Sequence, residues 1–409
     1  MEDRIPTGWI KIPLKNVAWW GTGGTPSRKN GSYFGGKIPW AKTKDLKDDF
    51  LNETEEFITE KGLANSNAKI FPKGSVAIAL YGASIGKTGI LGIDSATNQS
   101  CAVAIANSDV VNNRFLFYYL RSQKQNFIKK GQGGAQPNIS QTIVKAHPIL
   151  LPPLPEQNRI VEKLDSLMAR VEASKERLNK LSQIEDLLLQ SSLVDKNEPV
   201  KIVKLEHFLE EGKEKVGENW KGIRKIGVNK QIGIVELEIG QKKTFEKYKI
   251  VKPGDFIYNP MRVNIGSIAL YEGKEIAITS PDYVVFRIKH MLTPHLLLKF
   301  LKSKYGLGEI NVNTQGSVRS RLYFKSLVNV CYPLASTKKR EDAERLLVVL
   351  RELSKKKQQI ENKLDRLSQS LLAKAFRGEL VSQNSSDEPA EMLLARMRAE
   401  KSRKDSNHK

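Results

Sequence analysis

The segment Gly82–Thr88 comes closest to a catalytic motif in this chain of 409 residues. Its glycines, lysine and threonine resemble the loop G-x-x-x-x-G-K-[ST], which wraps a phosphate with successive backbone N–H groups. Only three residues separate Gly82 from Gly86, however, where that motif needs four. We therefore predict a glycine-rich turn at this position and no bound nucleotide.

Residues that do metal or acid–base chemistry are not grouped elsewhere in the sequence. The five histidines have no metal-ligand spacing, and Cys101 and Cys331 lie far apart. Tyr258–Met261, Y-N-P-M, contains only part of the N-P-P-Y motif of amino-methyltransferases, because the second proline and the closing aromatic residue are missing. We expect that this chain binds no metal or cofactor and catalyses no reaction by itself.

The remaining polar residues suit a polyanion. The chain has 67 Lys and Arg against 45 Asp and Glu, a net charge of +22, which favours nucleic acid as a partner. Arg can pair with guanine and Asn or Gln with adenine, whereas Ser, Thr and Lys mostly contact phosphates. For the first half of the chain we predict DNA contacts by Thr25, Ser27, Arg28, Lys29, Tyr33, Lys42, Lys44, Ser84, Lys87, Gln136 and Asn138. For the second half the predicted contacts are Asn259, Arg262, Asn264, Gln315, Ser317, Arg319 and Arg321. For any single residue the alternative is an ordinary solvated loop.

An internal repeat would place these polar loops in two similar domains. Residues 251–271 align with residues 71–91, and each segment reads as two strands around a glycine-rich bend. The aligned pairs are Gly74 with Gly254, Gly86 with Gly266, Leu120 with Leu301, and Ile139 with Leu322. Their offsets stay between 180 and 183 residues, so we predict one α/β fold that occurs twice.

Two long segments carry apolar residues in alternating steps of three and four, the pattern of a coiled-coil seam. In residues 155–193 the seam is Leu164, Leu167, Val171, Leu178, Leu181 and Leu188. In residues 341–376 it is Leu346, Leu350, Leu353, Ile360, Leu364, Leu367 and Leu371. We predict that the two helices pair antiparallel. The alternative is two separate amphipathic helices, each packed on its own neighbouring domain.

These patterns predict an α/β (α+β) fold with two tandem globular domains, each followed by a long helix, and with pseudo-twofold symmetry. The predicted parts are a first globular domain (1–154), a central helix (155–195), a second globular domain (196–335), a distal helix (336–380) and a polar, basic tail with a short helix (381–409). Neither a signal peptide nor a membrane span is evident, and the cysteines suit a reducing compartment. We therefore expect a cytoplasmic protein.

Three motifs in this arrangement resemble those of the specificity (S) subunits of type I restriction–modification enzymes. They are GTGGTPSR at 21–28, LPPLPEQNRIVEKLD at 151–165, and LSQSLLAKAFRGELVSQNSSDEPAEMLLARMRAEK at 367–401. The last two are the most specific. The second long helix departs from the pattern, because it lacks the P-x-x-E-Q signature at its start.

The resemblance implies that each domain reads one half of a bipartite site in double-stranded DNA. It implies that the helices fix the gap and bind two methyltransferase (M) subunits, which carry S-adenosylmethionine and methylate adenine. Restriction (R) subunits would use ATP and Mg²⁺ to cleave unmodified DNA. The partner-binding residues it implies are Glu156, Gln157, Arg159, Phe376 and Arg377. Two alternatives stay open: the specificity subunit of a system in which one polypeptide methylates and cuts, and a coiled-coil scaffold that does not bind DNA.

Overall fold

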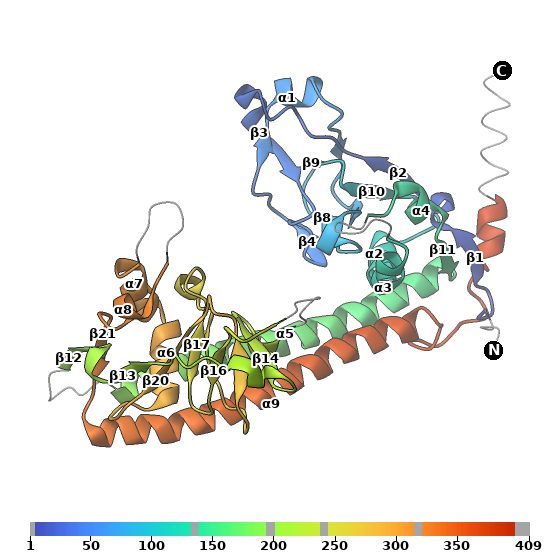
Figure 1. Cartoon of the computed structure of the whole chain (residues 1–409). Coiled ribbons are helices and arrows are strands. Elements are labelled where there is room, and N and C mark those ends of the chain that lie inside the picture. The colour runs from blue at the N-terminus through green and yellow to red at the C-terminus, as the bar shows by residue number, and fades with distance from the viewer. Residues whose placement is uncertain (1–4, 132–137, 194–200, 238–243, 315–320, 397–409) are drawn as a thin grey trace. The chain divides into compact units, whose positions relative to one another are not determined.

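The computed structural model of the chain describes residues 5–131, 138–193, 201–237, 244–314 and 321–396 (Figure 1). The chain divides into two compact units. The first joins Met1–Glu176 with Ile360–Lys409, and the second is Arg177–Gln359. Each unit therefore contains one globular domain and a part of each long helix.

The domain of the first unit is built on two small sheets. The larger has the order β2 (Ala18–Thr22), β10 (Cys101–Ala106), β7 (Val76–Ala79), β8 (Thr88–Leu91) and β4 (Asp49–Leu51). The smaller has the order β5 (Phe57–Ile58), β3 (Phe34–Ala41), β9 (Ser95–Thr97) and β6 (Ile70–Phe71). In the smaller sheet β3 and β9 are parallel. Their carboxyl ends therefore meet at one edge, where the residues that follow each strand come together.

Short helices cover the larger sheet and lead the chain to the first long helix. Two of them, α2 (Asn113–Ser122) and α3 (Lys124–Lys129), follow one another with only Gln123 between them. At the end of α2 the Tyr119 carbonyl accepts hydrogen bonds from the Ser122 hydroxyl at 2.6 Å and from the Gln123 N–H at 3.2 Å. The remaining elements are α1 (Glu60–Ala64), α4 (Gln141–Ala146) and the antiparallel pair β1 (Ile10–Pro13) with β11 (Pro148–Leu151).

The second domain repeats the strand order of the first, without an equivalent of β4 in its larger sheet. Its larger sheet is β13 (Leu209–Glu211), β20 (Val284–Ile288), β17 (Phe256–Tyr258) and β18 (Ile268–Leu270). Its smaller sheet is β15 (Gly233–Glu236), β14 (Arg224–Asn229), β19 (Ala277–Thr279) and β16 (Lys249–Val251), with β14 and β19 parallel. The pair β12 (Lys201–Lys204) with β21 (Cys331–Leu334) and the helices α6 (Pro294–Lys302), α7 (Lys304–Val312) and α8 (Phe324–Leu327) complete it. The predicted mixed α/β class and the internal repeat are confirmed.

Equivalent hydrogen bonds occur at aligned positions of the two domains. The N–H of Ile139 donates to the Leu80 carbonyl at 2.9 Å, and the N–H of Leu322 donates to the Pro260 carbonyl at 3.0 Å. Ile139 and Leu322 are both fully buried, or nearly so. In each domain this bond holds the chain just before α4 or α8 beside the bend between the two central strands.

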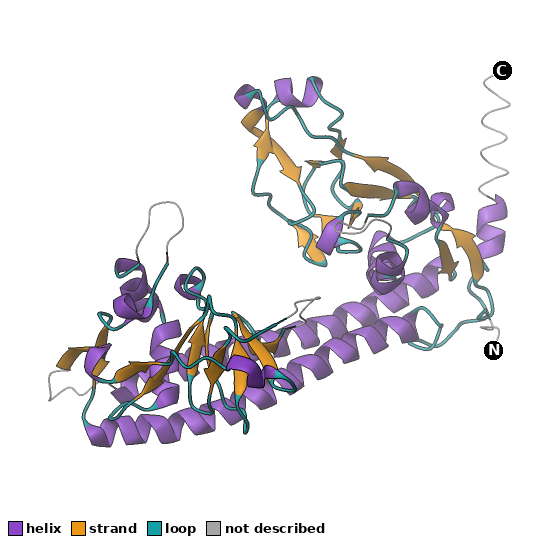
Figure 2. Cartoon of the chain, viewed as in Figure 1, coloured by secondary structure: helices purple, strands orange, loops and turns teal. Residues whose placement is uncertain are grey.

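The two predicted long helices are continuous in the structure, as α5 (Leu154–Leu193) and α9 (Thr337–Ala375) (Figure 2). Within the first unit they pack together and run antiparallel. Lys175 of α5 forms an ion pair with Asp365 of α9 at 2.9 Å, while earlier residues of α5 share a core with later residues of α9. The buried residues in this core include Ile160, Leu164, Met168, Leu372 and Ala375.

In the first unit the buried seam differs from the prediction: it is shifted by one residue in each helix, and the predicted positions Ile360 and Leu367 of α9 are 44% and 46% exposed. Met168 is buried where Leu167 is half-buried, and Leu372 is buried where Leu371 is half-buried. The reason is that α2 and the chain after α9 also pack on these helices, so the buried stripe faces more than the partner helix. The predicted position Leu188 lies outside the described side chains.

In the second unit the first half of α9 packs on its own domain. Leu347 and Leu350 of α9 form a buried cluster with Leu296 of α6. Two predicted seam positions, Leu181 and Leu353, are 48% and 47% exposed. For the described side chains of this unit, the alternative of an amphipathic helix on its neighbouring domain fits α9 better. Pairing over the whole length of the helices stays a prediction.

Candidate nucleic-acid interface

In the first domain, the loop that carries Thr25 to Lys29 is fixed to the shared edge of β3 and β9. The N–H of Gly24 donates to the Thr97 carbonyl at 2.9 Å, and the Trp40 indole N–H donates to the Gly24 carbonyl at 3.0 Å. A β-carbon on Gly23 would lie 1.7 Å from the Thr97 carbonyl oxygen, so this approach requires glycine. The G-T-G-G-T segment therefore holds the polar loop against the strand ends.

Two of the predicted cations in this region share one carboxylate. Arg28 forms an ion pair with Glu56 at 2.7 Å, and Lys42 pairs with the other oxygen of the same carboxylate. The Arg28 guanidinium lies 4.4 Å from the centre of the Phe34 ring and 5.2 Å from that of Trp40. The hydrogen bond from Lys42, and then that from Arg28, holds the pKa of Glu56 below its ordinary value although burial opposes this. Glu56 is therefore ionised near neutral pH.

The other predicted residues of this region have varied surroundings. The Thr25 hydroxyl donates to the Gln99 side chain at 2.5 Å, and Lys44 forms an ion pair with Glu55. Of the remaining residues predicted to contact DNA here, Ser27 and Lys29 are exposed, and Tyr33 is half-buried. This region can therefore offer hydroxyl, amide and guanidinium groups to a duplex, but much of its positive charge is already paired.

The turn Asn98–Ser100 joins this region to the bend between β7 and β8. The N–H of Asn98 donates to the Ala41 carbonyl at 3.0 Å, and the N–H of Leu80 donates to the Ser100 carbonyl at 2.9 Å. This turn and its Gln99 were not predicted from the sequence, although the run of polar residues N-Q-S was a usable signal. Glu55 and Glu56 were not predicted either, because acidic residues do not suggest DNA contact.

The bend carries the second group of predicted residues in the first domain. Tyr81 forms a β-bridge with Asn138, which is exposed. Ser84 and Lys87 are half-buried, and the N–H of Lys87 donates to the Ser84 carbonyl at 2.9 Å. Gln136 lies outside the described residues. The structure thus brings Ser84, Lys87 and Asn138 to one bend, and the turn Asn98–Ser100 connects that bend to the loop with Arg28.

The bend is a turn, as the spacing of its glycines predicted. Gly82 and Gly86 have φ values of +60° and +76°, and Gly266 at the aligned position has +88°. Thr88 begins strand β8, whereas a phosphate-binding loop leads into a helix whose N-terminus helps to hold the phosphate. Among the described residues no group of three His, Cys, Asp or Glu side chains could hold a metal ion.

The bend of the second domain carries different polar residues at the equivalent place. Arg262 is exposed and Asn264 is half-buried, while the Asn259 side chain accepts a hydrogen bond from the Met261 N–H at 2.9 Å. The Arg321 side chain donates to the Tyr323 hydroxyl at 3.1 Å. Gln315, Ser317 and Arg319 lie outside the described residues. Arg262 is thus the described cation of this bend that is best placed to reach a partner.

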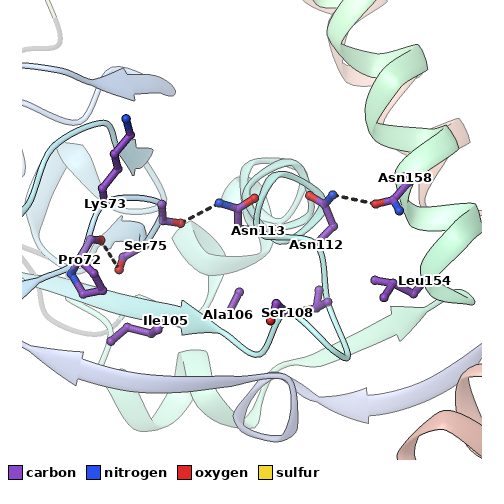
Figure 3. A pocket seen from close by; sticks show the side chains of 12 residues that line it. Pro72, Lys73, Ser75, Ile105, Ala106, Ser108, Asn112, Asn113, Leu154 and Asn158 are labelled. Atoms are coloured by element: carbon purple, nitrogen blue, oxygen red, sulfur yellow. Dashed lines mark hydrogen bonds between the residues drawn. The ribbon is translucent and has the colours of Figure 1, made fainter.

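The start of α5 is fixed to the first domain by Gln157, which is fully buried. Its side-chain oxygen accepts the Asn112 N–H at 2.9 Å, and its amide donates to the Val110 and Pro152 carbonyls, each at 3.0 Å. Beside this junction is a pocket of about 420 Å³, where the Asn112 amide donates to Asn158 (Figure 3). The sequence assigned Gln157 to a partner, but in the described structure its contacts are intramolecular.

Glu156 and Arg159 connect the same helix end to the two ends of the chain. The Trp9 indole donates to the Glu156 carboxylate at 3.1 Å, and Arg159 pairs with Asp387 at 2.8 Å. Glu156 is 1% exposed, and burial raises its pKa although the Trp9 hydrogen bond opposes this. The described contacts of Glu156 are thus also intramolecular, whereas Arg159 is half-buried.

The chain after α9 returns to the first domain. Phe376 is buried between Phe115 and Tyr119 of α2, with ring centres 5.3 Å and 5.2 Å away. Arg377 is exposed and forms an ion pair with Glu379 at 2.7 Å. Of the five residues predicted to bind a partner, Glu156, Gln157 and Phe376 are therefore core residues of this unit, and Arg159 and Arg377 keep exposed atoms.

Comparisons with known proteins agree with this architecture. Residues 6–183 match the family described as "Type I restriction modification DNA specificity domain". Over 365 residues the chain is 24% identical to "Type I restriction enzyme EcoBI specificity subunit" of Escherichia coli, which covers 74% of this chain and 75% of that protein. Residues 6–183 of the chain are thus similar to the DNA specificity domain of type I restriction–modification enzymes, and the curated relatives that match are specificity subunits, which are non-catalytic.

The chain is also similar to two further proteins. It is 28% identical over 196 residues to "Type I restriction enzyme MjaIX specificity subunit" of Methanocaldococcus jannaschii, covering 47% of this chain and 45% of that protein. That match thus spans less than half of the relative's length. A chain in the solved structure described as "Structural basis underlying complex assembly and conformational transition of the type I R-M system" has the same fold, with a TM-score of 0.59. It is 21% identical, and the match covers 92% of this chain and 99% of that one.

None of the helices in the described part of the chain is both long and apolar enough to cross a membrane.

Proposed function

We propose that this chain is a specificity subunit, which selects the DNA target of a type I restriction–modification complex. Each domain reads one half of a bipartite site in double-stranded DNA, and α5 and α9 fix the gap between the halves. The helices dock two methyltransferase subunits, which use S-adenosylmethionine to methylate adenine in the target. Restriction subunits use ATP and Mg²⁺ to cleave unmodified DNA. The cytoplasmic location expected from the sequence belongs to the same proposal.

The observation that carries this proposal is a strand order that occurs twice, with different polar residues at equivalent bends. Ser84 and Lys87 occupy the bend of the first domain, and Asn259, Arg262 and Asn264 that of the second. Two copies of one scaffold with different base-contacting groups suit two different half-sites. A scaffold that does not bind DNA would give no reason for this difference or for the charge of +22.

The test is a map of methylated adenines in the source genome, with the gene intact and with it deleted. We expect a split motif with a fixed gap to lose its methylation on deletion. An unchanged map would contradict the proposal. A partner subunit with an N-P-P-[YF] motif and no nuclease motif would separate type I from a system in which one polypeptide methylates and cuts.

The role proposed for the helices has its own test. One heptad of about 10.5 Å inserted into both α5 and α9 should lengthen the gap in the methylated motif and leave both halves unchanged. Altered halves with an unchanged gap would show that the helices do not set the spacing.

A further inference from the structure

The carboxylate of Glu56 pairs with two of the cations that the sequence assigned to DNA in the first domain, Arg28 and Lys42. Its backbone is held firmly, because its carbonyl accepts the Trp40 N–H at 3.0 Å and the Thr54 hydroxyl at 2.9 Å. Thr54 and Trp40 are both buried. The backbone position from which the Glu56 side chain extends is therefore fixed in the domain, and the ion pairs with Arg28 and Lys42 hold its carboxylate.

Lys42 is turned inward by this carboxylate. Its side chain is only 14% exposed, and its ammonium group is paired with Glu56 and lies 5.8 Å from the centre of the Trp40 ring. A DNA phosphate could take this ammonium only by breaking a pair that is already shielded from water. Lys42 therefore adds little to sequence-independent attraction, which depends on free cations that replace counterions on the phosphates.

Arg28 is fixed but still accessible. One of its terminal nitrogens is paired with Glu56, one face of the guanidinium is stacked on Phe34, and 55% of the side chain is exposed. An arginine whose orientation is fixed in this way keeps further N–H groups that can form the forked pair of hydrogen bonds to guanine. An arginine without such partners would swing to the nearest phosphate as a point charge.

We propose that Glu56 is a specificity-determining residue of the first domain, which orients Arg28 toward a base edge and withholds the charges of Arg28 and Lys42 from DNA phosphates. This inference rests on the proposed function. Glu56 is a positioning residue in this role, since it acts through the two cations. The proposal predicts two effects of removing the negative charge of Glu56. Binding to unrelated DNA becomes stronger, and discrimination of the target sequence becomes weaker.

The experiment compares wild type, Glu56→Gln and Glu53→Gln in the assembled complex with its methyltransferase subunits. Glu53 is a matched control: it is exposed in the same segment, and the described structure gives it no ion pair. Affinities are measured for a duplex with the methylated motif and for a scrambled duplex over a range of salt concentrations. The side chain of glutamine keeps the size and an acceptor oxygen of Glu56, so the fold is retained.

For Glu56→Gln we expect tighter binding of the scrambled duplex and a salt dependence steeper by about 0.9 in log–log slope for each cation released. The ratio of target to scrambled affinity should fall roughly tenfold, as for one disturbed bidentate arginine contact. Glu53→Gln should leave this ratio unchanged. In Arg28→Ala, which should already have lost this discrimination, adding Glu56→Gln should lower the ratio no further.

Several outcomes would overturn the inference. They are an equal loss of affinity for both duplexes, an unchanged salt slope, or the same behaviour in the Glu53→Gln control. A wild-type complex that binds both duplexes equally would instead refute the proposed function itself. A map of methylated adenines in cells with Glu56→Gln gives an independent readout: we expect relaxed selection in one half of the motif, and relaxation in both halves or neither would refute the assignment.

Discussion

The hydrogen bonds of Gln157 lead to a quantitative prediction for the junction between the first domain and α5. The substitution Gln157→Ala removes three hydrogen bonds from a fully buried site. It leaves the Asn112 N–H and the Val110 and Pro152 carbonyls without this partner. The free energy of unfolding of the first unit should therefore fall.

The size of this loss follows from the number of bonds. Each net hydrogen bond contributes about 0.5–1.5 kcal/mol, so three contribute about 1.5–4.5 kcal/mol. The site is fully buried, and the three backbone groups lose their hydrogen-bond partner without gaining another. We therefore expect the free energy of unfolding to fall by an amount near the middle of this range, about 3 kcal/mol. This would be a substantial part of the stability of an ordinary domain.

Urea unfolding followed by tryptophan fluorescence measures this loss selectively. Trp9, Trp19, Trp20 and Trp40 belong to the first unit, and Trp220 belongs to the second. The matched control is Asn158→Ala on the same turn of α5, where an exposed side chain accepts a single hydrogen bond. We expect it to cost less than about 1 kcal/mol. If Gln157→Ala costs no more than this control, the hydrogen-bond argument for the junction is wrong.

Three further predictions concern the same unit and the second domain. Phe376→Ala should destabilise the first unit by about 3–5 kcal/mol in the same assay, because it empties a buried site, whereas the exposed Val348→Ala should change stability by less than about 0.5 kcal/mol. Burial raises the pKa of Glu156 above its ordinary value of 4.5, so its contribution to stability is complete at lower pH and is lost as pH rises through the raised pKa. Glu156→Gln should remove this part of the pH dependence, and an unchanged pH profile of the urea midpoint would contradict the assignment. Arg262→Ala should relax only one half of the methylated motif; uniformly weaker binding to all DNA would instead make it a phosphate contact.

The sequence determined those features that depend on local pattern. The two long helices follow from apolar residues at helical spacing. The paired domains follow from the near-constant offset between their motifs, and the turn at Gly82–Gly86 follows from glycine spacing that is wrong for a phosphate loop. The helices and the turn can be worked out from neighbours in the chain, because a short stretch of backbone has few ways to satisfy its own hydrogen bonds and bury its apolar face. The repeat follows from comparing segments 180 to 183 residues apart.

The tertiary structure decided which groups meet. A periodic pattern shows that a helix buries one face but not what covers that face, so it could not tell that α2 shares the α5 core or that Met168 replaces Leu167 in it. Nor could it show that Glu156 is held by Trp9, 147 residues away in sequence.

For the candidate site, too, one part was predictable from the sequence and another part was not. Its polar loops were predictable from composition and spacing, and they border one connected turn in the first domain. The pairing of Arg28 and Lys42 with Glu56 was not predictable, because an acidic residue far along the chain carries no local mark of the cations it will neutralise. A sequence therefore states how much charge a surface has, and only the fold decides how much of that charge is left for a partner.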